Sequence, residues 1–400
     1  RNNLAYAYES AGDLKRAISL YTATLAQRER VLGNTHPATL TSRNNLASAY
    51  QSAGDLKRAI PLYTATLAQR ERVLGNTHPA TLTSRNNLAS AYESAGDLER
   101  AIPLYTVTLA QCEQVLGDTH PDTLSSRNNL AYAYESAGDL KRAISLYTAT
   151  LAQRERVLGS THPDTLTSRN NLAYAFQTAR DLKRAIPLLE ATLAQRERVL
   201  GSTHPDTLTS RINLASAYES AGDLGRAIPL YTATVAQCER VLGETHPSTL
   251  ISRNNLAYAY ESAGDLKRAI PLYTTALARR EQVLGTTHPD TLASRNNLAY
   301  AYHAAGDLEQ AIPLFEATLA QCEQVLGDTH PDTLSSRNNL ANAYHAAGDL
   351  GRAIPLLEAT LAQRERVLGS THPDTLTSRD NLAGARQQAG LYSREVQQPQ

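Results

Sequence analysis

The chain of 400 residues has no methionine, two phenylalanines and three cysteines. Because it lacks a starting methionine, we expect it to be a segment of a longer protein, in which an upstream leader or domain would go unseen. An odd number of cysteines in so long a chain argues against a disulfide framework and favours a reducing, cytoplasmic compartment. No stretch approaches the roughly 18 consecutive apolar residues that a membrane-spanning helix needs.

An excess of one charge is also missing, because 39 lysines and arginines balance 39 aspartates and glutamates. Proteins that bind nucleic acids or membrane surfaces use a basic excess to meet phosphate groups. The balanced charge therefore predicts neither a nucleic-acid partner nor a membrane partner. With 42% apolar and 20% charged residues, the composition is otherwise that of an ordinary soluble protein.

What the chain does have is a strict internal repeat of 42 residues. Nine full copies fill residues 1–378, a partial tenth copy covers 379–390, and residues 391–400 form a polar tail. The copies begin at Arg1, Arg43, Arg85, Arg127, Arg169, Arg211, Arg253, Arg295 and Arg337. A repeat of this length predicts an elongated array in which each unit stacks on its neighbours and no central core is needed. A place within the 42-residue unit is called a position below.

Each unit has the pattern of two helices joined by a tight turn. The first helix opens near Thr119, Pro121 and Asp122, which fit a capping box with proline in the first turn. It ends at an Ala-Gly-Asp turn, as in residues 11–13, where glycine suits a left-handed conformation and aspartate caps the next helix. The second helix ends before Gly33 and carries one apolar stripe of Leu14, Ala17, Ile18, Tyr21, Leu25 and Leu32. The predicted fold class is therefore all-α, with no β structure.

Two departures from this pattern carry local predictions. Most copies place a proline at position 19, as in Pro61, which is expected to bend the second helix, whereas Ser19 and Ser145 occupy that place in two copies. Arg180 stands where the other turns have glycine. We expect a cost of about 1 kcal/mol there, since a residue with a side chain must adopt a left-handed conformation.

Residues 253–290 read RNNLAYAYESAGDLKRAIPLYTTALARREQVLGTTHPD. This string resembles the tetratricopeptide repeats of kinesin light chains in its Asn-Asn-Leu-Ala start, its glycine turn, its Pro-Leu-Tyr segment and its Val-Leu-Gly before His-Pro-Asp. It is also similar to long 42-residue arrays of bacterial proteins, some of which are sensor ends of signal-transduction nucleotide triphosphatases. The resemblance covers residues 1–390. It implies a right-handed superhelical solenoid that binds peptides or proteins in a concave groove lined mainly by first helices, with neither catalysis nor a cofactor.

The residues of the first helix predict which face lines that groove. At about 100° per residue, positions 4, 5, 7, 8, 11 and 12 share a packing arc, whereas positions 2, 3, 6, 9, 10 and 13 share a polar arc. Position 3 of this polar arc is occupied by Asn3, Asn45, Asn87, Asn129, Asn171, Asn213, Asn255, Asn297 and Asn339. Asparagine amides can hydrogen-bond the backbone of an extended peptide whatever its side chains. The alternative is that these asparagines bond the backbone of the neighbouring repeat and set the stacking.

Positions 6 and 9 vary between copies. Position 6 is aromatic in five copies and small and polar in the others; the aromatic residues are Tyr6, Tyr132, Tyr174, Tyr258 and Tyr300. Tyrosine is enriched in recognition surfaces and predicts side-chain pockets here, although the ring could instead lean on the next helix. Position 9 is mainly acidic, from Glu9 to Glu261, and ends with His303 and His345. This pattern predicts an acidic groove that favours basic peptides and whose histidine end responds to pH. The alternative is a row of glutamates that is exposed to solvent and binds nothing.

Other constellations are set aside. The histidines at position 36, such as His36 and His78, recur about one helix-packing distance apart, roughly 10 Å, whereas zinc needs its ligands about 2 Å from one ion. They are predicted to be structural. Three cysteines share position 28 in separate copies, too far apart for a disulfide; they are Cys112, Cys238 and Cys322. There is no glycine-rich phosphate loop, CxxC pair or Ser-His-Asp order.

The basic residues of the second helix lie away from its apolar stripe. They occupy positions 15, 16, 28 and 30 and are represented by Lys15, Arg16, Arg28 and Arg30. We expect them to form a solvated face balanced by Glu29 and its equivalents. A nucleic-acid role is the less favoured alternative, because few aromatic residues lie among them to stack on bases.

Three functional hypotheses follow. The first is a non-enzymatic scaffold that holds a peptide or partner protein in its groove. The second is the ligand-sensing arm of a larger nucleotide triphosphatase, which a phosphate-binding loop upstream of Arg1 would favour. The third is end-to-end self-association, because the first copy lacks its own lead-in and is expected to expose apolar surface.

Overall fold

A computed structural model describes residues 2–10 and 12–396, with side chains described to residue 390. Residue 11 of the first turn and residues 397–400 of the predicted tail lie outside the described residues. The described part of the chain holds 19 helices and no strand, which confirms the all-α prediction.

The helices alternate between first and second members of the hairpins. The first members are α1 (Asn2–Ser10), α3 (Pro37–Ser52), α5 (Pro79–Ser94), α7 (Pro121–Ser136), α9 (Pro163–Thr178), α11 (Pro205–Ser220), α13 (Pro247–Ser262), α15 (Pro289–Ala304), α17 (Pro331–Ala346) and α19 (Pro373–Val396). The second members are α2 (Leu14–Leu32), α4 (Leu56–Leu74), α6 (Leu98–Leu116), α8 (Leu140–Leu158), α10 (Leu182–Leu200), α12 (Leu224–Leu242), α14 (Leu266–Leu284), α16 (Leu308–Leu326) and α18 (Leu350–Leu368). Helix α19 continues past residue 390, where the polar tail was predicted to begin.

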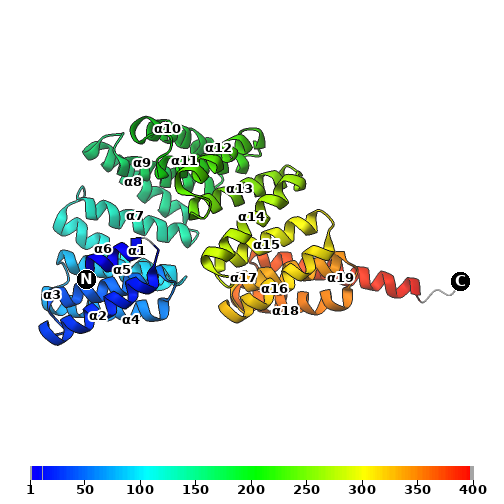
Figure 1. Ribbon diagram of the computed structural model, residues 1–400, viewed down its shortest axis with the longest axis horizontal. Coiled ribbons are helices and arrows are strands. Elements are labelled where there is room, and N and C mark those ends of the chain that lie inside the picture. The colour runs from blue at the N-terminus through cyan, green and yellow to red at the C-terminus, as the bar shows by residue number, and fades with distance from the viewer. Residues whose placement is uncertain (1, 11, 397–400) are drawn as a thin grey trace. The chain divides into compact units, whose positions relative to one another are not determined.

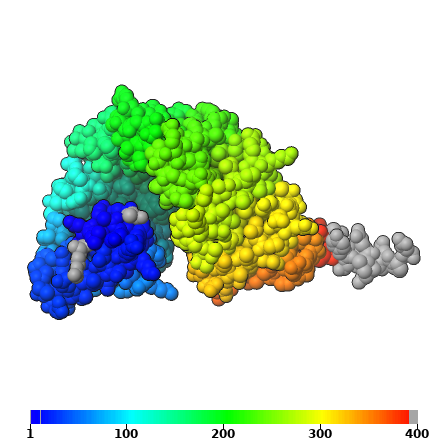
Figure 2. All heavy atoms as spheres, in the orientation of Figure 1, coloured from blue at the N-terminus to red at the C-terminus, as the bar shows by residue number. Residues whose placement is uncertain are grey.

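The chain divides into two compact units, residues 1–199 and residues 200–400. Helices α1 to α9 of the first unit, and helices α11 to α19 of the second, pack on one another in chain order, so that hairpin follows hairpin within each unit (Figure 1). First helices of neighbouring hairpins also touch, as α3 touches α5 and α15 touches α17. In the space-filling view the colours follow one another from repeat to repeat within each unit, as expected for a solenoid (Figure 2).

The apolar core is shared between neighbouring hairpins and does not lie inside any one of them. In one cluster, Ala47 of α3 and Tyr63 and Leu67 of α4 pack against Leu88 and Ala91 of α5. The equivalent residues of α13, α14 and α15 form the same cluster in the second unit. Tyr63 is 2% exposed, and burying a side chain of that size contributes about 2–3 kcal/mol. A hairpin is therefore completed by the next one along the chain.

The first helices begin differently from the prediction. The capping box expected at Thr119 and Asp122 is wrong, because the cap is His120, whose Nδ1 accepts the backbone N–H of Asp122 at 3.2 Å. The physical reason is Pro121, which holds the residue before it in an extended conformation and so aims the ring at the open end of the helix. The same bond recurs at His36, His78, His162, His204, His246, His288, His330 and His372. The predicted structural role of these histidines is thus confirmed.

The turns within the hairpins follow the prediction. Gly96 has φ 75°, and Oδ1 of the next residue, Asp97, accepts the backbone N–H of Arg100 at 3.1 Å. The second helix α6 ends at Gly117 with φ 86°. Among the described residues, Arg180 alone has a positive φ, 61°, without being glycine. The predicted strained turn between α9 and α10 is confirmed.

The proline at position 19 does not end the second helix. Helix α4 contains Pro61 and spans 19 residues, as α2 does with Ser19 in the same place. Proline has no N–H to give to the carbonyl of Lys57 one turn earlier, but Pro61 is exposed, so water can satisfy that carbonyl. The local bend of these helices remains a prediction.

Candidate functional site

The arginine at position 1 forms an ion pair and hydrogen bonds that connect neighbouring hairpins. The guanidinium of Arg85 on α5 donates to the carboxylate of Glu71 on α4 at 2.7 Å and to the amide oxygen of Gln111 on α6. Arg85 is 4% exposed, so removing Glu71 would leave a buried charge without its pair. Seven further copies, the partial tenth included, hold the same pair: Arg43–Glu29, Arg127–Glu113, Arg169–Glu155, Arg253–Glu239, Arg295–Glu281, Arg337–Glu323 and Arg379–Glu365. These pairs fix the register of one hairpin on the next.

Position 28 corrects a prediction. It was expected on a solvated face, but Arg70 is buried and donates to the backbone carbonyl of Ala80 and to Oγ of Ser84, both at 2.8 Å. The same burial lowers the pKa of Arg70. The prediction was wrong because it considered one hairpin, whereas the first helix of the next hairpin covers this position. The other predicted basic positions are exposed, as Lys15, Arg16 and Arg30 show.

The three cysteines at position 28 are buried in the same way and unpaired with one another. Burial raises the pKa of each thiol; the residues are Cys112, Cys238 and Cys322. They are therefore neutral at pH 7, and thiolate chemistry is disfavoured there.

The asparagines at position 3 form a ladder between repeats. The amide Nδ2 of Asn87 donates to Oδ1 of Asn44 in the preceding repeat at 3.1 Å. The same bond joins Asn129 to Asn86, Asn171 to Asn128, Asn297 to Asn254, Asn339 to Asn296, and Asn381 to Asn338. The partner is thus a side chain, not the neighbouring backbone considered above. Each bond uses one of the two amide hydrogens, and Asn87 remains half-buried, so that contact with a peptide remains a prediction.

The tyrosines at position 6 stand out from the same face. Tyr132, Tyr174, Tyr258 and Tyr300 are between 49% and 53% exposed, and Tyr6 is 66% exposed. Part of each of these residues is covered, so that a ring leaning on the next helix and a ring that contacts a partner both remain predictions. Exposed tyrosine rings supply a large contact area for a partner.

The acidic residues at position 9 turn towards the hairpin. Oε2 of Glu261 accepts the hydroxyl of Tyr273, a residue of α14, at 2.8 Å. Burial is the main cause that raises the pKa of Glu261, while the hydrogen bond from Tyr273 opposes it. Corresponding pairs are Glu9–Tyr21, Glu93–Tyr105, Glu135–Tyr147 and Glu219–Tyr231. The row is half-buried and internally bonded, so it is not the solvated row of the alternative.

The histidine end of this row is also half-buried. Nε2 of His303 is a buried atom without a hydrogen-bond partner, and burial lowers the pKa of His303. The ring is consequently neutral at pH 7, and its charge appears in more acidic solution than for an exposed histidine.

Positions 3, 6 and 9 come together in clefts between neighbouring first helices. In the second unit, a cleft of about 680 Å³ between α13 and α15 is lined by Tyr258 and Glu261 on one side and by Asn297 and Tyr300 on the other. Tyr273 of α14 closes its base. The residues predicted from the sequence thus line one surface, although Tyr273 was assigned to the apolar stripe alone. The signal for its second role was a tyrosine in a buried stripe, whose hydroxyl needs a hydrogen-bond partner.

The first unit has a cleft at the equivalent place. It measures about 450 Å³ and lies between α3 and α5, with Ser48, Gln51 and Ser90 at positions 6, 9 and 6. Asn87 and Tyr63 complete the lining at the positions that Asn297 and Tyr273 occupy in the second unit. The face of the first helices is therefore hollowed in both units but carries different side chains.

The described residues include no group of three or more histidines, cysteines or acidic residues placed to hold a metal ion. No helix in the described part of the chain is long and apolar enough to cross a membrane.

Comparison with known proteins places these features in a family. The tetratricopeptide repeat family matches in nine overlapping segments: residues 1–71, 43–114, 95–152, 134–194, 175–236, 220–282, 264–320, 290–365 and 338–397. No curated protein matches the chain.

Solved structures are similar as well. A protein of Podosopora anserina with nearly identical TPR-like repeats of the kinesin-light-chain kind is 36% identical; the match covers 51% of this chain and 97% of that chain, with a TM-score of 0.47. A Rap protein complexed with competence and sporulation factor is 15% identical, with 91% and 98% covered and a TM-score of 0.54. The STAND signal-transduction ATPase PH0952 of Pyrococcus horikoshii, which has a tetratricopeptide repeat sensor, is 14% identical, with 90% and 54% covered and a TM-score of 0.54. This chain therefore spans about half the length of that ATPase.

The family matches run from end to end of the described array and agree with the 42-residue period, the helix hairpins and the shared inter-hairpin cores. Arrays of such repeats act as scaffolds for protein–protein interaction and are generally non-enzymatic. The chain belongs to the tetratricopeptide repeat family, and its own copies are nearly identical 42-residue repeats.

Proposed function

We propose that the chain is a non-enzymatic scaffold that holds an extended segment of a protein or peptide along the face of its first helices. The observation that carries this proposal is the cleft between α13 and α15, where Tyr258 and Tyr300 stand half-exposed on opposite sides. Two rings one repeat apart can contact successive side chains of a chain that crosses the helices. Tyrosine does this at low cost in conformational entropy, because it has two rotatable side-chain bonds.

Polar groups beside the tyrosine rings determine which kind of peptide the cleft favours. The half-buried Asn297 offers an amide to a peptide backbone, and Glu261 places negative charge in the same cleft. An acidic cleft favours a partner with basic residues and disfavours an acidic one. The similarity in fold to a Rap protein that was solved in complex with competence and sporulation factor supports a binding role for an array of this kind.

The proposal is tested by selecting peptides from a random display library on the whole chain and mapping where the tightest one binds. Hydrogen exchange with and without the selected peptide is the measurement. We expect protection of α13 and α15, and weaker or no protection of the exposed surface of the second helices. Protection confined to second helices, or the absence of any saturable binder, would refute the proposal.

A second role remains a proposal of its own, namely the sensor arm of a larger signal-transduction nucleotide triphosphatase. The fold is shared with the repeat sensor of a STAND ATPase, which supports the architecture of such an arm. The test is ATP hydrolysis by the complete gene product with and without the selected peptide. A product that carries no nucleotide-binding domain would rule this role out.

End-to-end self-association stays a prediction from the sequence. Leu4 and Tyr6 of α1 are 52% and 66% exposed, as the prediction requires of the first copy. Light scattering at rising protein concentration tests it, and a constant molar mass would contradict it.

A further inference from the structure

The copies divide at position 28, where some carry arginine and others cysteine. In five arginine copies the guanidinium donates both to the backbone carbonyl at position 38 and to the serine hydroxyl at position 42, each at the start of the next first helix. The arginines are Arg28, Arg70, Arg154, Arg280 and Arg364. The junction between two repeats is thus built as a receptor for a guanidinium group, which the chain itself normally fills.

Two of the three cysteine copies have an open cleft at this place. At Cys322 a cleft of about 110 Å³ lies between α15, α16 and α17, and at Cys112 an equivalent cleft of about 140 Å³ lies between α5, α6 and α7. A single water needs about 10–15 Å³ of such space. Both clefts therefore have room for a group much larger than one water at the place where other copies hold the guanidinium.

The acceptors of the missing group are still in place. Ser336 is 2% exposed, lines the cleft of Cys322, and its Oγ has no hydrogen-bond partner. Its equivalent, Ser294, accepts Arg280 at 2.5 Å. A buried hydroxyl without a partner costs roughly 1–3 kcal/mol, so a donor from outside would be favoured there. Asp332 lies at the rim with its side chain 70% exposed and adds negative charge at the entrance.

The basic neighbour of the cleft does not oppose a second cation. Arg295 donates to Glu281 and to Gln321, each at 2.6 Å, so its charge is already paired. The same pairing is present where position 28 is arginine, as in Arg85–Glu71, and where it is cysteine, as in Arg127–Glu113. A guanidinium group at position 28 and a paired arginine at position 1 therefore occur together in one junction, as Arg70 and Arg85 show.

We propose that the Cys322 cleft binds an alkylguanidinium group: the arginine side chain of a bound protein segment. We extend the proposal to the Cys112 cleft at the equivalent junction, where the serine hydroxyl, Oγ of Ser126, lies 3.6 Å from Sγ of Cys112. The binding group is expected to donate to Ser336 and to the carbonyl of Asp332, as Arg280 does to Ser294 and to the carbonyl of Asp290. The site for the guanidinium stands on the junction alone. That the arginine comes from a segment held along the first helices rests on the function proposed above.

The position of the cleft fits such a segment. Asn296 and Asn297 of α15 line both the Cys322 cleft and the tyrosine cleft between α13 and α15. The two clefts therefore adjoin across one helix. A chain that contacts Tyr300 can place an arginine side chain into the Cys322 cleft on the next junction.

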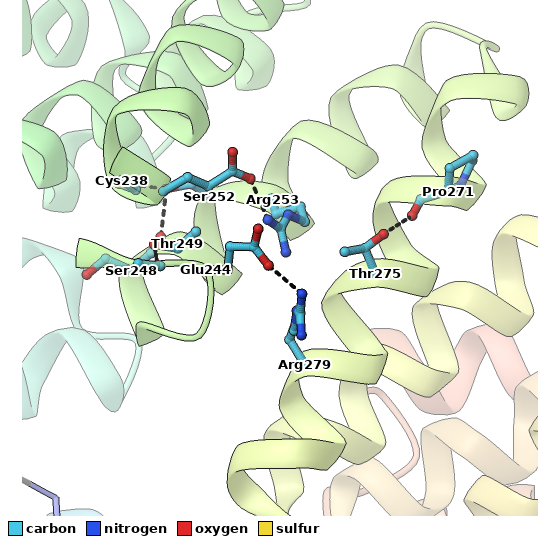
Figure 3. A network of polar contacts seen from close by, with 11 residues as sticks. Cys238, Glu244, Ser248, Thr249, Ser252, Arg253, Pro271, Thr275 and Arg279 are labelled. Atoms are coloured by element: carbon cyan, nitrogen blue, oxygen red, sulfur yellow. Dashed lines mark hydrogen bonds and ion pairs between the residues drawn. The ribbon is translucent and has the colours of Figure 1, made fainter. Parts of the chain in front are cut away.

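The third cysteine copy provides a contrast within the same chain. In the close-up of this junction, the hydroxyl of Ser252 lies between Cys238 and Ser248 (Figure 3). It donates to the carbonyl of Ser248 at 2.7 Å and lies 3.9 Å from Sγ of Cys238. Position 38 is here a serine, so no acidic side chain stands at that rim. The acceptors of this junction are already engaged, and we expect it not to bind the guanidinium.

The first test uses ethylguanidinium chloride at millimolar concentration as the probe, with ionic strength held constant by sodium chloride. Hydrogen exchange and melting temperature of the whole chain are measured. We expect a saturable protection of α15–α17 and α5–α7, whereas the neutral isostere ethylurea gives none. The variant Cys112→Arg/Cys322→Arg fills both clefts with the residue that other copies use, and is expected to lose the response. An equal response in that variant, or no saturable response in the wild type, overturns the proposal.

A gain of function completes the first test. Arg280→Ala opens a further junction, and ethylguanidinium is expected to restore part of the melting temperature that this variant loses. Because the wild type and the cysteine variants are measured beside it, a misfolded Arg280→Ala would leave the conclusion from the other chains intact. If ethylurea raised the melting temperature of Arg280→Ala as much as ethylguanidinium does, the result would contradict a site that is specific for guanidinium.

The second test separates the site from its occupant. A peptide selected on the chain and containing arginine is compared with the same peptide containing citrulline, which keeps the shape but has no charge. We expect at least tenfold tighter binding of the arginine form to the wild type, and equal binding of both forms to Cys112→Arg/Cys322→Arg. Equal binding of both forms to the wild type would show that a groove-bound chain does not supply the group. If no peptide binds while ethylguanidinium does, the proposed function fails and the guanidinium site stands.

Discussion

The cleft between α3 and α5 and the cleft between α13 and α15 occupy the same place in their repeats but present different chemistry. Both contain the asparagine of position 3 and the buried tyrosine of position 21. The first has serine, glutamine and serine where the second has Tyr258, Glu261 and Tyr300. The four helices that carry these side chains begin and end at equivalent positions. The comparison therefore teaches that the side chains of the cleft can change while the helices that carry them stay the same.

The largest effect is expected from making the second cleft resemble the first. Tyr258→Ser with Tyr300→Ser removes two aromatic contact surfaces, and central aromatic residues of interfaces are often worth about 2 kcal/mol or more. Affinity for a peptide selected on the wild type should fall roughly thirtyfold, measured by isothermal titration calorimetry. The control is Val157→Ser, which removes an exposed apolar side chain from a second helix. Equal losses in both variants would mean that the tyrosines are not special.

The reverse change should create a site. Ser48→Tyr, Gln51→Glu and Ser90→Tyr give the first cleft the side chains of the second, on a frame that already holds Asn87 and Tyr63. We expect binding of the same peptide at the first cleft to strengthen about tenfold, or about 1.4 kcal/mol, and its stoichiometry to rise. An unchanged stoichiometry in calorimetry would show that positions 6 and 9 are insufficient.

What the two clefts share can be tested through the asparagine ladder. Replacing Asn87 and Asn297 together by alanine removes the bonds from Asn87 to Asn44 and from Asn297 to Asn254, each worth about 1 kcal/mol. The melting temperature should fall, helicity by circular dichroism should stay nearly intact, and peptide affinity should weaken a few-fold. An unaltered affinity would refute the groove role of position 3 and leave its stacking role. Asn76→Ala, in an exposed turn, is the control.

The smallest effect concerns position 9 and pH. Burial raises the pKa of Glu261 in the folded chain, so folding favours its protonated form. Its contribution to stability is then greatest below the ordinary glutamate pKa and is lost as pH rises through the raised value. Glu261→Gln, which copies the glutamine of position 9 in the first cleft, should therefore be relatively more stable at pH 7 by less than about 1 kcal/mol.

This pH prediction is checked by melting temperatures between pH 4 and pH 8. The difference between Glu261→Gln and wild type should shrink towards pH 4. Glu99→Gln, an exposed residue of α6, serves as the control. A difference that stays constant over this range would show that the burial of Glu261 is not what sets it.

The sequence predicted the helices and turns well because they depend on local signals. Glycine at the turn, aspartate after it and the apolar stripe act within one hairpin, and even the strained Arg180 was expected from its place in the turn. The histidine cap was missed because a capping box and a histidine before proline make similar patterns. Local geometry around Pro121 decides between them.

The candidate site was predicted only in part, because neighbouring hairpins complete it. Position 28 was assigned to solvent on a single helix, whereas Arg70 is covered by α5. The asparagine ladder, the Glu261–Tyr273 bond and the cleft at Cys322 all join residues 12 or more positions apart in the sequence. The alternation of arginine and cysteine at one position, opposite an unchanging serine, was the signal that could have revealed the open clefts.

Cores shared between consecutive hairpins have a consequence for how the gene can change. Residues 1–42 and 127–168 differ at two positions. If one whole copy were lost or gained, each remaining hairpin would therefore pack against a neighbour with almost the same side chains as before. Recombination between near-identical copies can thus change the length of the array in steps of one repeat, and no new type of contact between hairpins is needed.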